Sequence, residues 1–120
     1  MSAMQRRKGA QAEREVLKLL GEELGQSLNR NLEQTRGGGA DCLEVWGFAI
    51  EVKRQESLRR PAWWRQACEQ AARTGNEPML LYRRSREAWK AWIHTRDGKW
   101  REGSLIDAAC AIREKWAMRP

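Results

Sequence analysis

Residues 48–54 constrain the fold of this chain most, because their side chains alternate in character along the sequence. Phe48, Ile50 and Val52 are apolar and stand two residues apart. Successive side chains of a strand point to opposite faces, so these three should face a core. Glu51 and Lys53 should then lie side by side on the other face. The segment therefore predicts a core strand that carries an acid and a base on its second face.

The remaining periodicities predict a mixed α/β sheet covered by helices, with the order α-β-β-β-α-β followed by a hairpin and a helix. A first helix is expected over residues 8–24, where an apolar stripe runs to Leu24 and Gly25 follows. The other expected elements are an extended piece at 28–34, strands at 41–45, 48–54, 79–82 and 91–94, a helix at 61–73, a hairpin turn at Asp97-Gly98 into 99–101, and a helix at 105–116.

The length of 120 residues fits one domain over residues 1–120. No apolar run is long enough to cross a bilayer, and the first ten residues lack the apolar core of a signal peptide. We therefore expect no membrane partner and a cytoplasmic location, which is the host cytoplasm if a virus encodes the chain. Three scattered cysteines and one histidine disfavour a zinc knuckle or a site built from several imidazoles.

The chain is basic, with 23 Lys and Arg against 16 Asp and Glu and a net charge of +7. A polyanion is the natural partner of such a chain, because phosphate contacts dominate nucleic-acid affinity. A basic surface that serves solubility, or one that faces a membrane, is the alternative. No basic amphipathic helix with a continuous aromatic face supports the membrane version. Charge therefore favours a nucleic acid without establishing it.

The pair formed by Glu51 and Lys53 can carry phosphate chemistry. A carboxylate can hold a hard cation such as magnesium, and a lysine on the same face can orient water or neutralise charge on a phosphate. Alone, the pattern Glu-x-Lys is short and common, so an ordinary ion pair on a strand explains it equally well. A second carboxylate, Asp41, stands ten residues earlier and just after three glycines. Two neighbouring carboxylates make a metal site the better interpretation.

The turn at Trp46-Gly47 decides whether Asp41 can reach Glu51. A two-residue turn would place Asp41 opposite Val52, on the wrong face. A three-residue loop over residues 45–47, with Gly47 in the left-handed region, places Asp41 opposite Glu51 instead. A catalytic role for Asp41 therefore predicts the three-residue loop or a bulge at Asp41.

A third carboxylate, Glu13, falls on the apolar stripe of the first helix. A first-turn glutamate favoured by the helix dipole would explain it alone. Beside Asp41 and Glu51, however, a carboxylate on the core-facing side of a helix is expected to have a partner. We therefore expect Glu13 to support a cation directly or through water.

The stretch Lys8-Gly9-Ala10-Gln11-Ala12-Glu13-Arg14-Glu15 with Arg7 before it, the glycine-rich loop, Asp41 and the Glu-x-Lys strand together resemble archaeal-type Holliday junction resolvases and their phage relatives, which belong to the PD-(D/E)xK nuclease superfamily. The resemblance covers about the first 55 residues and implies a restriction-endonuclease-like sheet flanked by helices. It implies catalytic roles for Glu13, Asp41, Glu51 and Lys53, and a role in activity or DNA contact for Arg14. The loop at 35–39 and the tryptophan-rich second half depart from the archaeal pattern.

The same resemblance implies Mg²⁺, with Mn²⁺ as a substitute, held by Asp41, Glu51 and the backbone carbonyl of Val52, and through water by Glu13. It also implies a two-fold homodimer, because cutting two opposed strands calls for two active sites. In the helix expected over residues 61–73, Gln66 and Gln70 occupy positions at which many nucleases of this superfamily have a polar residue that assists the active site.

Aromatic and basic residues add candidate contacts to DNA. Seven tryptophans are many for this length, and most should fill the core. Trp63 and Trp64 are the better candidates for stacking on unpaired bases, because arginines surround them. The expected DNA-binding residues are Arg6, Arg7, Lys8, Arg14, Arg36, Arg54, Arg59, Arg60, Trp63 and Trp64.

The sequence thus favours a metal-dependent DNA endonuclease that cuts four-way junctions, which is a Holliday junction resolvase. One alternative is a nicking or restriction-type nuclease acting on duplex or flapped DNA, because the same site serves both. The other is a DNA-binding module without catalysis. Clustered carboxylates argue against that module, because they would repel DNA unless a cation lay between them.

Overall fold

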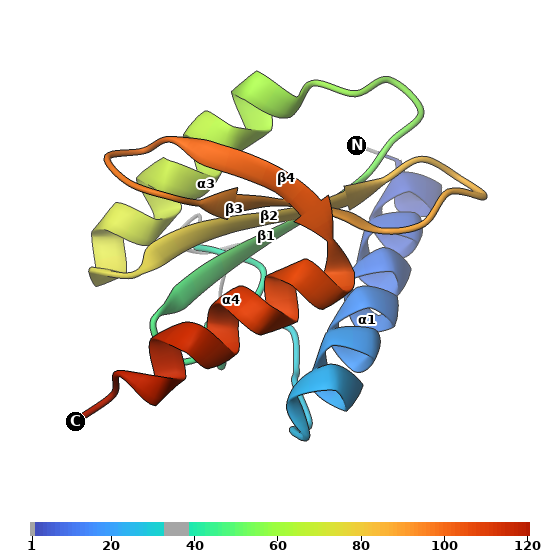
Figure 1. Ribbon diagram of the computed structural model, residues 1–120. Helices are drawn as coiled ribbons and strands as arrows, with labels where there is room; N and C mark the ends of the chain where they lie inside the picture. The colour runs from blue at the N-terminus through green and yellow to red at the C-terminus, as the bar shows by residue number, and fades with distance from the viewer. Residues whose placement is uncertain (1, 33–38) are drawn as a thin grey trace.

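Helices cover both faces of a four-stranded sheet in the computed structural model, which describes residues 2–32 and 39–120 (Figure 1). The strands lie in the order β1-β2-β3-β4; β1 and β2 run parallel, and the other neighbours run antiparallel. This mixed sheet confirms the predicted α/β, restriction-endonuclease-like fold. The elements in chain order are α1 (Ala3–Leu24), β1 (Phe48–Arg54), α3 (Arg60–Thr74), β2 (Glu77–Arg83), β3 (Lys90–His94), β4 (Trp100–Ser104) and α4 (Leu105–Ala117).

Two apolar clusters fill the space on either side of the sheet. On one face, the predicted apolar side chains of β1, including Phe48 and Ile50, pack with residues of α1 and α4. On the other face, α3 packs its tryptophans against Leu80, Tyr82 and Trp92. Helix α3 also forms the crossover that two parallel strands require, because it carries the chain from the end of β1 back to the start of β2 (Figure 1).

Helix α1 begins earlier than the apolar stripe predicts. Ser2 caps it through a capping box, in which the Ser2 side chain accepts from the Gln5 amide and the Gln5 side chain accepts from the Ser2 amide. The helix ends as predicted, with Gly25 in the left-handed region at φ 70°. The earlier start places Arg6 and Arg7 on the helix together with Lys8, where the prediction began.

The expected strand at 41–45 is wrong. One isolated antiparallel bridge, between Cys42 and Ile50, takes its place. The Asp41 side chain accepts a hydrogen bond of 2.6 Å from the Val52 amide. The Val52 amide therefore bonds to a side chain rather than to the backbone of residues 39–41. The pairing between this segment and β1 ends after the single bridge. Residues 28–32 form no strand either, and 33–34 lie outside the described residues.

The second half of the chain follows the expected order with shifted boundaries. Asp97 and Gly98 form the predicted hairpin turn, with φ of 53° and 75°, which is the pattern of a type I′ turn. Strand β4 extends to Ser104, beyond the expected 99–101, and Ser104 then caps α4. No helix within the described residues has the length and apolar character needed to span a membrane.

Candidate active site

A cleft of about 830 Å³ lies beside β1, between the N-terminal half of α1, α3 and the segment that follows β1. The four residues predicted to be catalytic all line this cleft: Glu13, Asp41, Glu51 and Lys53. They come from a helix, a loop and a strand that are distant in sequence. The structure therefore brings together the groups that the sequence selected.

The register between Asp41 and Glu51 is the one that a catalytic role requires. The bridge between Cys42 and Ile50 is antiparallel, so the next residues outward, Asp41 and Glu51, stand opposite each other. Gly47 has φ 86°, and the Phe48 amide donates to the Val45 carbonyl, which closes the loop over residues 45–47. The predicted three-residue loop with a left-handed glycine is thus confirmed.

Asp41 and Glu51 are both withdrawn from solvent, with 6% and 2% of their surface exposed. Burial and the negative charge of Asp41 raise the pKa of Glu51 to about 8, while the positive charge of Lys53 acts in the opposite direction. A divalent cation between the two carboxylates would favour the charged form of both. The pair therefore fits a hard cation, whose preferred ligands are carboxylate oxygens.

The Val52 carbonyl lies on the outer edge of β1, on the side of Asp41. Within a strand, the amide and carbonyl of one residue lie on the same side, and the Val52 amide points toward Asp41. The carbonyl of Ile50, two residues earlier, likewise accepts from Cys42 on this outer side. The backbone oxygen of Val52 therefore lies on the same edge of β1 as Asp41, and Val52 lines the cleft.

Glu13 has a partner that the sequence did not reveal. Its carboxylate, buried on α1, forms an ion pair of 2.6 Å with Nε of Arg30, which also lines the cleft. The amide of the next residue, Asn31, donates to the Asp41 carbonyl at 2.7 Å, so this segment is fixed to the site. A buried glutamate signals that a partner exists, but the non-periodic segment gave no means of choosing Arg30.

Within residues 2–32 and 39–120, no group of three or more histidine, cysteine, aspartate or glutamate side chains gathers as a metal centre. Two carboxylates nevertheless suit magnesium, which keeps several waters and is usually bound through one or two carboxylates. Because Arg30 holds Glu13, a ligand set of Asp41, Glu51 and the Val52 carbonyl fits this geometry better than one in which Glu13 binds the cation directly.

The predicted DNA-binding cations differ in their position relative to the cleft. Arg6, Lys8 and Arg54 line the cleft. Arg7, Arg14 and Arg59 are exposed but are not among the residues that line it. Arg60 forms an ion pair with Glu102, 3.5 Å away, and its guanidinium lies 6.0 Å from the ring centres of Tyr82 and Trp92. Arg36 lies outside the described residues.

Trp63 and Trp64 lie in the core, which corrects the expectation that they stack on bases. Only 5% and 6% of their surface is exposed. The Trp64 ring packs edge-on against Trp92, and its Nε1 donates to the Gly98 carbonyl at 2.8 Å. Neither ring has a face open to a base, because α3 turns both toward the sheet. Polar residues of α3 face the cleft instead, among them Gln66 and Gln70.

A restriction-endonuclease-like sheet with a buried Asp-Glu pair and a lysine in one cleft defines the class of PD-(D/E)xK nucleases. Residues 4–109 match the family described as "Phage putative PDDEXK endonuclease", and the chain belongs to this family. The match spans α1 to the first turn of α4. A search of curated proteins and a search of solved structures gave no significant match. Nucleases of this class generally use divalent metal ions.

Proposed function

We propose that this endonuclease is a Holliday junction resolvase, which hydrolyses DNA phosphodiesters in four-way junctions with the help of Mg²⁺. The observation that carries the proposal is the convergence of Asp41, Glu51 and Lys53 in one cleft that cationic side chains also line. Carboxylates suit the cation, and lysine and arginine suit the phosphate. Neither set alone would favour phosphodiester cleavage.

Each side chain of the cleft has a distinct part in the reaction. Asp41, Glu51 and the Val52 carbonyl would hold Mg²⁺, or Mn²⁺ in its place, and the cation would supply charge neutralisation and a more acidic bound water. Lys53 orients the attacking water or stabilises the negative charge that develops on the phosphate. Arg6 and Lys8, at the start of α1, neutralise neighbouring phosphates.

Selectivity for junctions is supported by the similarity of residues 7–15 to the corresponding helix of archaeal-type resolvases. Recognition of a branch depends on shape and backbone contacts, so residues that read bases are not required. Cutting two opposed strands needs two active sites, and we therefore propose that the chain acts as a homodimer. Cleavage would take place in the cytoplasm of a phage-infected host.

A nicking or restriction-type nuclease would use the same cleft on duplex or flapped DNA, so only a comparison of substrates separates the two activities. A DNA-binding module without catalysis is less consistent with the site. Two buried carboxylates in a cleft that receives DNA would repel phosphate, and a binding protein gains nothing from them.

A cleavage assay tests the proposal. A synthetic four-way junction and a linear duplex of the same sequence are incubated with the protein, each with magnesium and with a chelator. Paired cuts in the junction alone, lost with chelator and with Lys53→Ala, support the resolvase; Lys99→Ala, an exposed lysine of the β3–β4 hairpin, is the matched control and should cut normally. Equal cutting of both substrates rejects junction selectivity. Binding without any cleavage rejects the nuclease proposal.

A further inference from the structure

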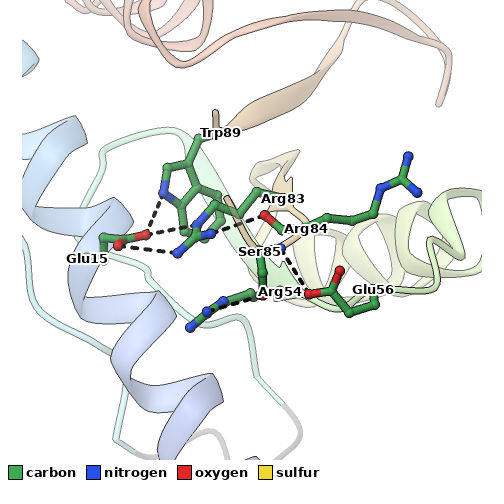
Figure 2. A network of polar contacts seen from close by, with 7 residues as sticks. All are labelled: Glu15, Arg54, Glu56, Arg83, Arg84, Ser85 and Trp89. Atoms are coloured by element: carbon green, nitrogen blue, oxygen red, sulfur yellow. Dashed lines mark hydrogen bonds and ion pairs between the residues drawn. The ribbon is translucent and has the colours of Figure 1, made fainter. Parts of the chain in front are cut away.

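The loop between β2 and β3 is tied at both ends to α1 (Figure 2). Glu15 of α1 accepts a hydrogen bond of 3.0 Å from Nε of Arg83, the last residue of β2, and one of 2.8 Å from Nε1 of Trp89, just before β3. The Arg83 guanidinium also lies 5.3 Å from the centre of the Trp89 ring. Since one carboxylate holds both ends of the loop, the loop has a fixed path over α1.

The middle of this loop contacts the strand β1 and the segment after it, through Ser85 (Figure 2). Ser85 lines the same cleft as Asp41 and Glu51. Its amide donates to Glu56 at 3.1 Å, and its hydroxyl accepts from Arg54 at 3.3 Å. Arg54 is the last residue of β1, the strand that carries Glu51 and Lys53, so the loop is fixed to the catalytic strand itself.

Two exposed arginines, Arg84 and Arg86, flank Ser85. Arg84 pairs with Glu87 at 3.3 Å, but both side chains are more than 40% exposed, and such surface pairs contribute little and exchange readily. In the described part of the chain, the Arg86 side chain makes no hydrogen bond or ion pair. A phosphate could therefore approach either guanidinium without breaking a buried contact.

Arg86 also has a strained backbone, with φ 66°. Among the described residues, Asp97 is the other non-glycine residue with positive φ, and both residues lie in turns. Arg86 is the third residue of a turn in which the Glu87 amide donates to the Arg84 carbonyl at 3.2 Å, a position where positive φ occurs and glycine is favoured. For an arginine, the left-handed region is less favourable than for glycine, and such conformations are often found at ligand-binding segments. Glycine or asparagine would adopt this conformation at lower cost, so substituting either of them removes the guanidinium without adding backbone strain.

The loop lies at the end of the sheet where α1 begins, whereas the β3–β4 hairpin lies at the opposite end (Figure 1). Arg6 and Lys8 line the cleft from the start of α1, and Ser85 lines it from the loop. We infer that residues 84–86 form a second DNA-binding element, whose two arginines bind backbone phosphates of the strand next to the one being cut. The inference rests on the proposed cleavage of DNA, and it makes Glu15 a positioning residue for the loop.

DNA binding by Arg86→Asn and Arg86→Gly tests the element independently of cleavage. Affinity is measured by fluorescence anisotropy on a four-way junction, with chelator present and over a range of salt concentrations. We expect affinity to fall about 5- to 10-fold, and the slope of log K against log salt to become less steep by about 1, as for the loss of one phosphate contact. The melting temperature should stay the same or rise, because both substitutions relieve the strain at φ 66°.

The matched control is Arg96→Asn, an exposed arginine of the β3–β4 hairpin at the far end of the sheet. It should leave affinity and salt slope unchanged. The inference is overturned if Arg86→Asn binds like the wild type, or if Arg96→Asn weakens binding equally, because net charge alone would then explain the loss.

Cleavage kinetics separate failure of this inference from failure of the proposed function. With magnesium, Arg86→Asn should raise KM and leave kcat unchanged, because the loop holds DNA and does not touch the reacting phosphate. Glu15→Gln should act in the same direction. If the wild-type protein cuts junctions and both variants keep the wild-type KM, the proposed function stands and the second DNA-binding element is rejected. If the wild-type protein binds DNA through Arg86 but does not cut it, the second DNA-binding element stands and the proposed nuclease activity is rejected.

Discussion

At the scale of single residues, the site contains buried carboxylates, and a buried charge without a partner of opposite charge is unfavourable. Asp41 and Glu51 face each other below 10% exposure, and Glu13 is held by an arginine from a distant loop. In its charged form, each carboxylate therefore needs a positive partner: a cation for the first two and Arg30 for the third. The two kinds of partner lead to different expectations for substitution.

Replacing Asp41 by asparagine removes a proposed metal ligand while keeping the size of the side chain. We expect Asp41→Asn to lower kcat at least about 100-fold, because a neutral amide holds a cation far less well than a carboxylate. The metal-free fold should not be strongly destabilised, because the oxygen of an asparagine amide can still accept the hydrogen bond from the Val52 amide. Steady-state cleavage and thermal unfolding with chelator measure both effects. Asp97→Asn, in an exposed turn, is the control, and undiminished cleavage by Asp41→Asn would refute the ligand assignment.

Replacing Arg30 by alanine leaves the Glu13 carboxylate buried without its ion pair. We expect Arg30→Ala to lower the free energy of unfolding by about 2 kcal/mol. In Glu13→Gln the same Arg30 substitution should cost much less, because no buried charge is left behind. A double-mutant cycle in urea measures this coupling. Additive losses would show that the pair of 2.6 Å contributes nothing to stability.

Strand alternation and turn geometry made much of the site predictable. They place Glu51 and Lys53 on one face, and they select the loop that puts Asp41 opposite Glu51. Arg30 was not predictable, because the segment around it has no periodicity to fix where its side chain points. The positions of Trp63 and Trp64 were missed for a related reason: flanking arginines suggested exposure, while the face that a helix turns inward depends on the sheet beneath it.

At the scale of elements, the strands and helices with clear periodicity formed as expected, and the differences arise where side chains replace backbone contacts. The Ser2 capping box extends α1 toward the N-terminus, and the Asp41 side chain ends the pairing expected of residues 41–45. Propensity scales describe neither event, since each depends on one hydrogen bond between particular residues.

Glu77, at the start of β2, joins two other elements through its carboxylate. Lys115 of α4 donates to it at 2.6 Å, and Nδ1 of His94 of β3 lies 3.0 Å away. Partial burial acts to raise the pKa of Glu77, but these hydrogen bonds outweigh it, and the pKa lies below its usual 4.5. The bonds therefore stabilise the fold above pH 4.5, and this contribution is lost as the pH falls through the lowered pKa.

Thermal unfolding between pH 6 and pH 3 tests this contribution. The melting temperature of Glu77→Gln should fall less over this range than that of the wild type, because the variant has no carboxylate to protonate. Glu114→Gln, at an exposed position of α4, should keep the wild-type profile. Identical profiles for Glu77→Gln and the wild type would show that the contact between β2 and α4 does not depend on charge.

Trp64 joins α3 to the β3–β4 hairpin through its bond to the Gly98 carbonyl. We expect Trp64→Phe to destabilise the protein by about 1–2 kcal/mol, since it removes this bond and part of the packing. Cleavage measured well below the melting temperature should be unchanged, because the indole does not reach the cleft. If Trp64→Phe had normal stability but no longer bound DNA, the prediction would be wrong, and Trp64 would be assigned the role of stacking on bases despite its burial.

At the scale of the whole molecule, cation binding and folding should be linked, because the unfolded chain has no preformed pair of carboxylates. Magnesium at about 100 times its dissociation constant should stabilise the fold by about 2.7 kcal/mol. The melting temperature should therefore rise with magnesium and return to its starting value with chelator. Glu51→Gln should abolish the rise, whereas Glu114→Gln should keep it. An equal rise in both variants would place the cation elsewhere.

The position of β1 in the sheet has a consequence for how the molecule behaves at high concentration. It is an edge strand, and exposed edges invite other chains to add a strand and aggregate. Three successive outward amides of β1 are already occupied: Phe48 donates to Val45, Ile50 to Cys42, and Val52 to the Asp41 side chain. A second chain therefore finds no free donor among these three amides, which makes strand addition along this stretch less favourable. The aspartate that we assign to catalysis thus also occupies one of the amides through which another chain could add a strand to this edge.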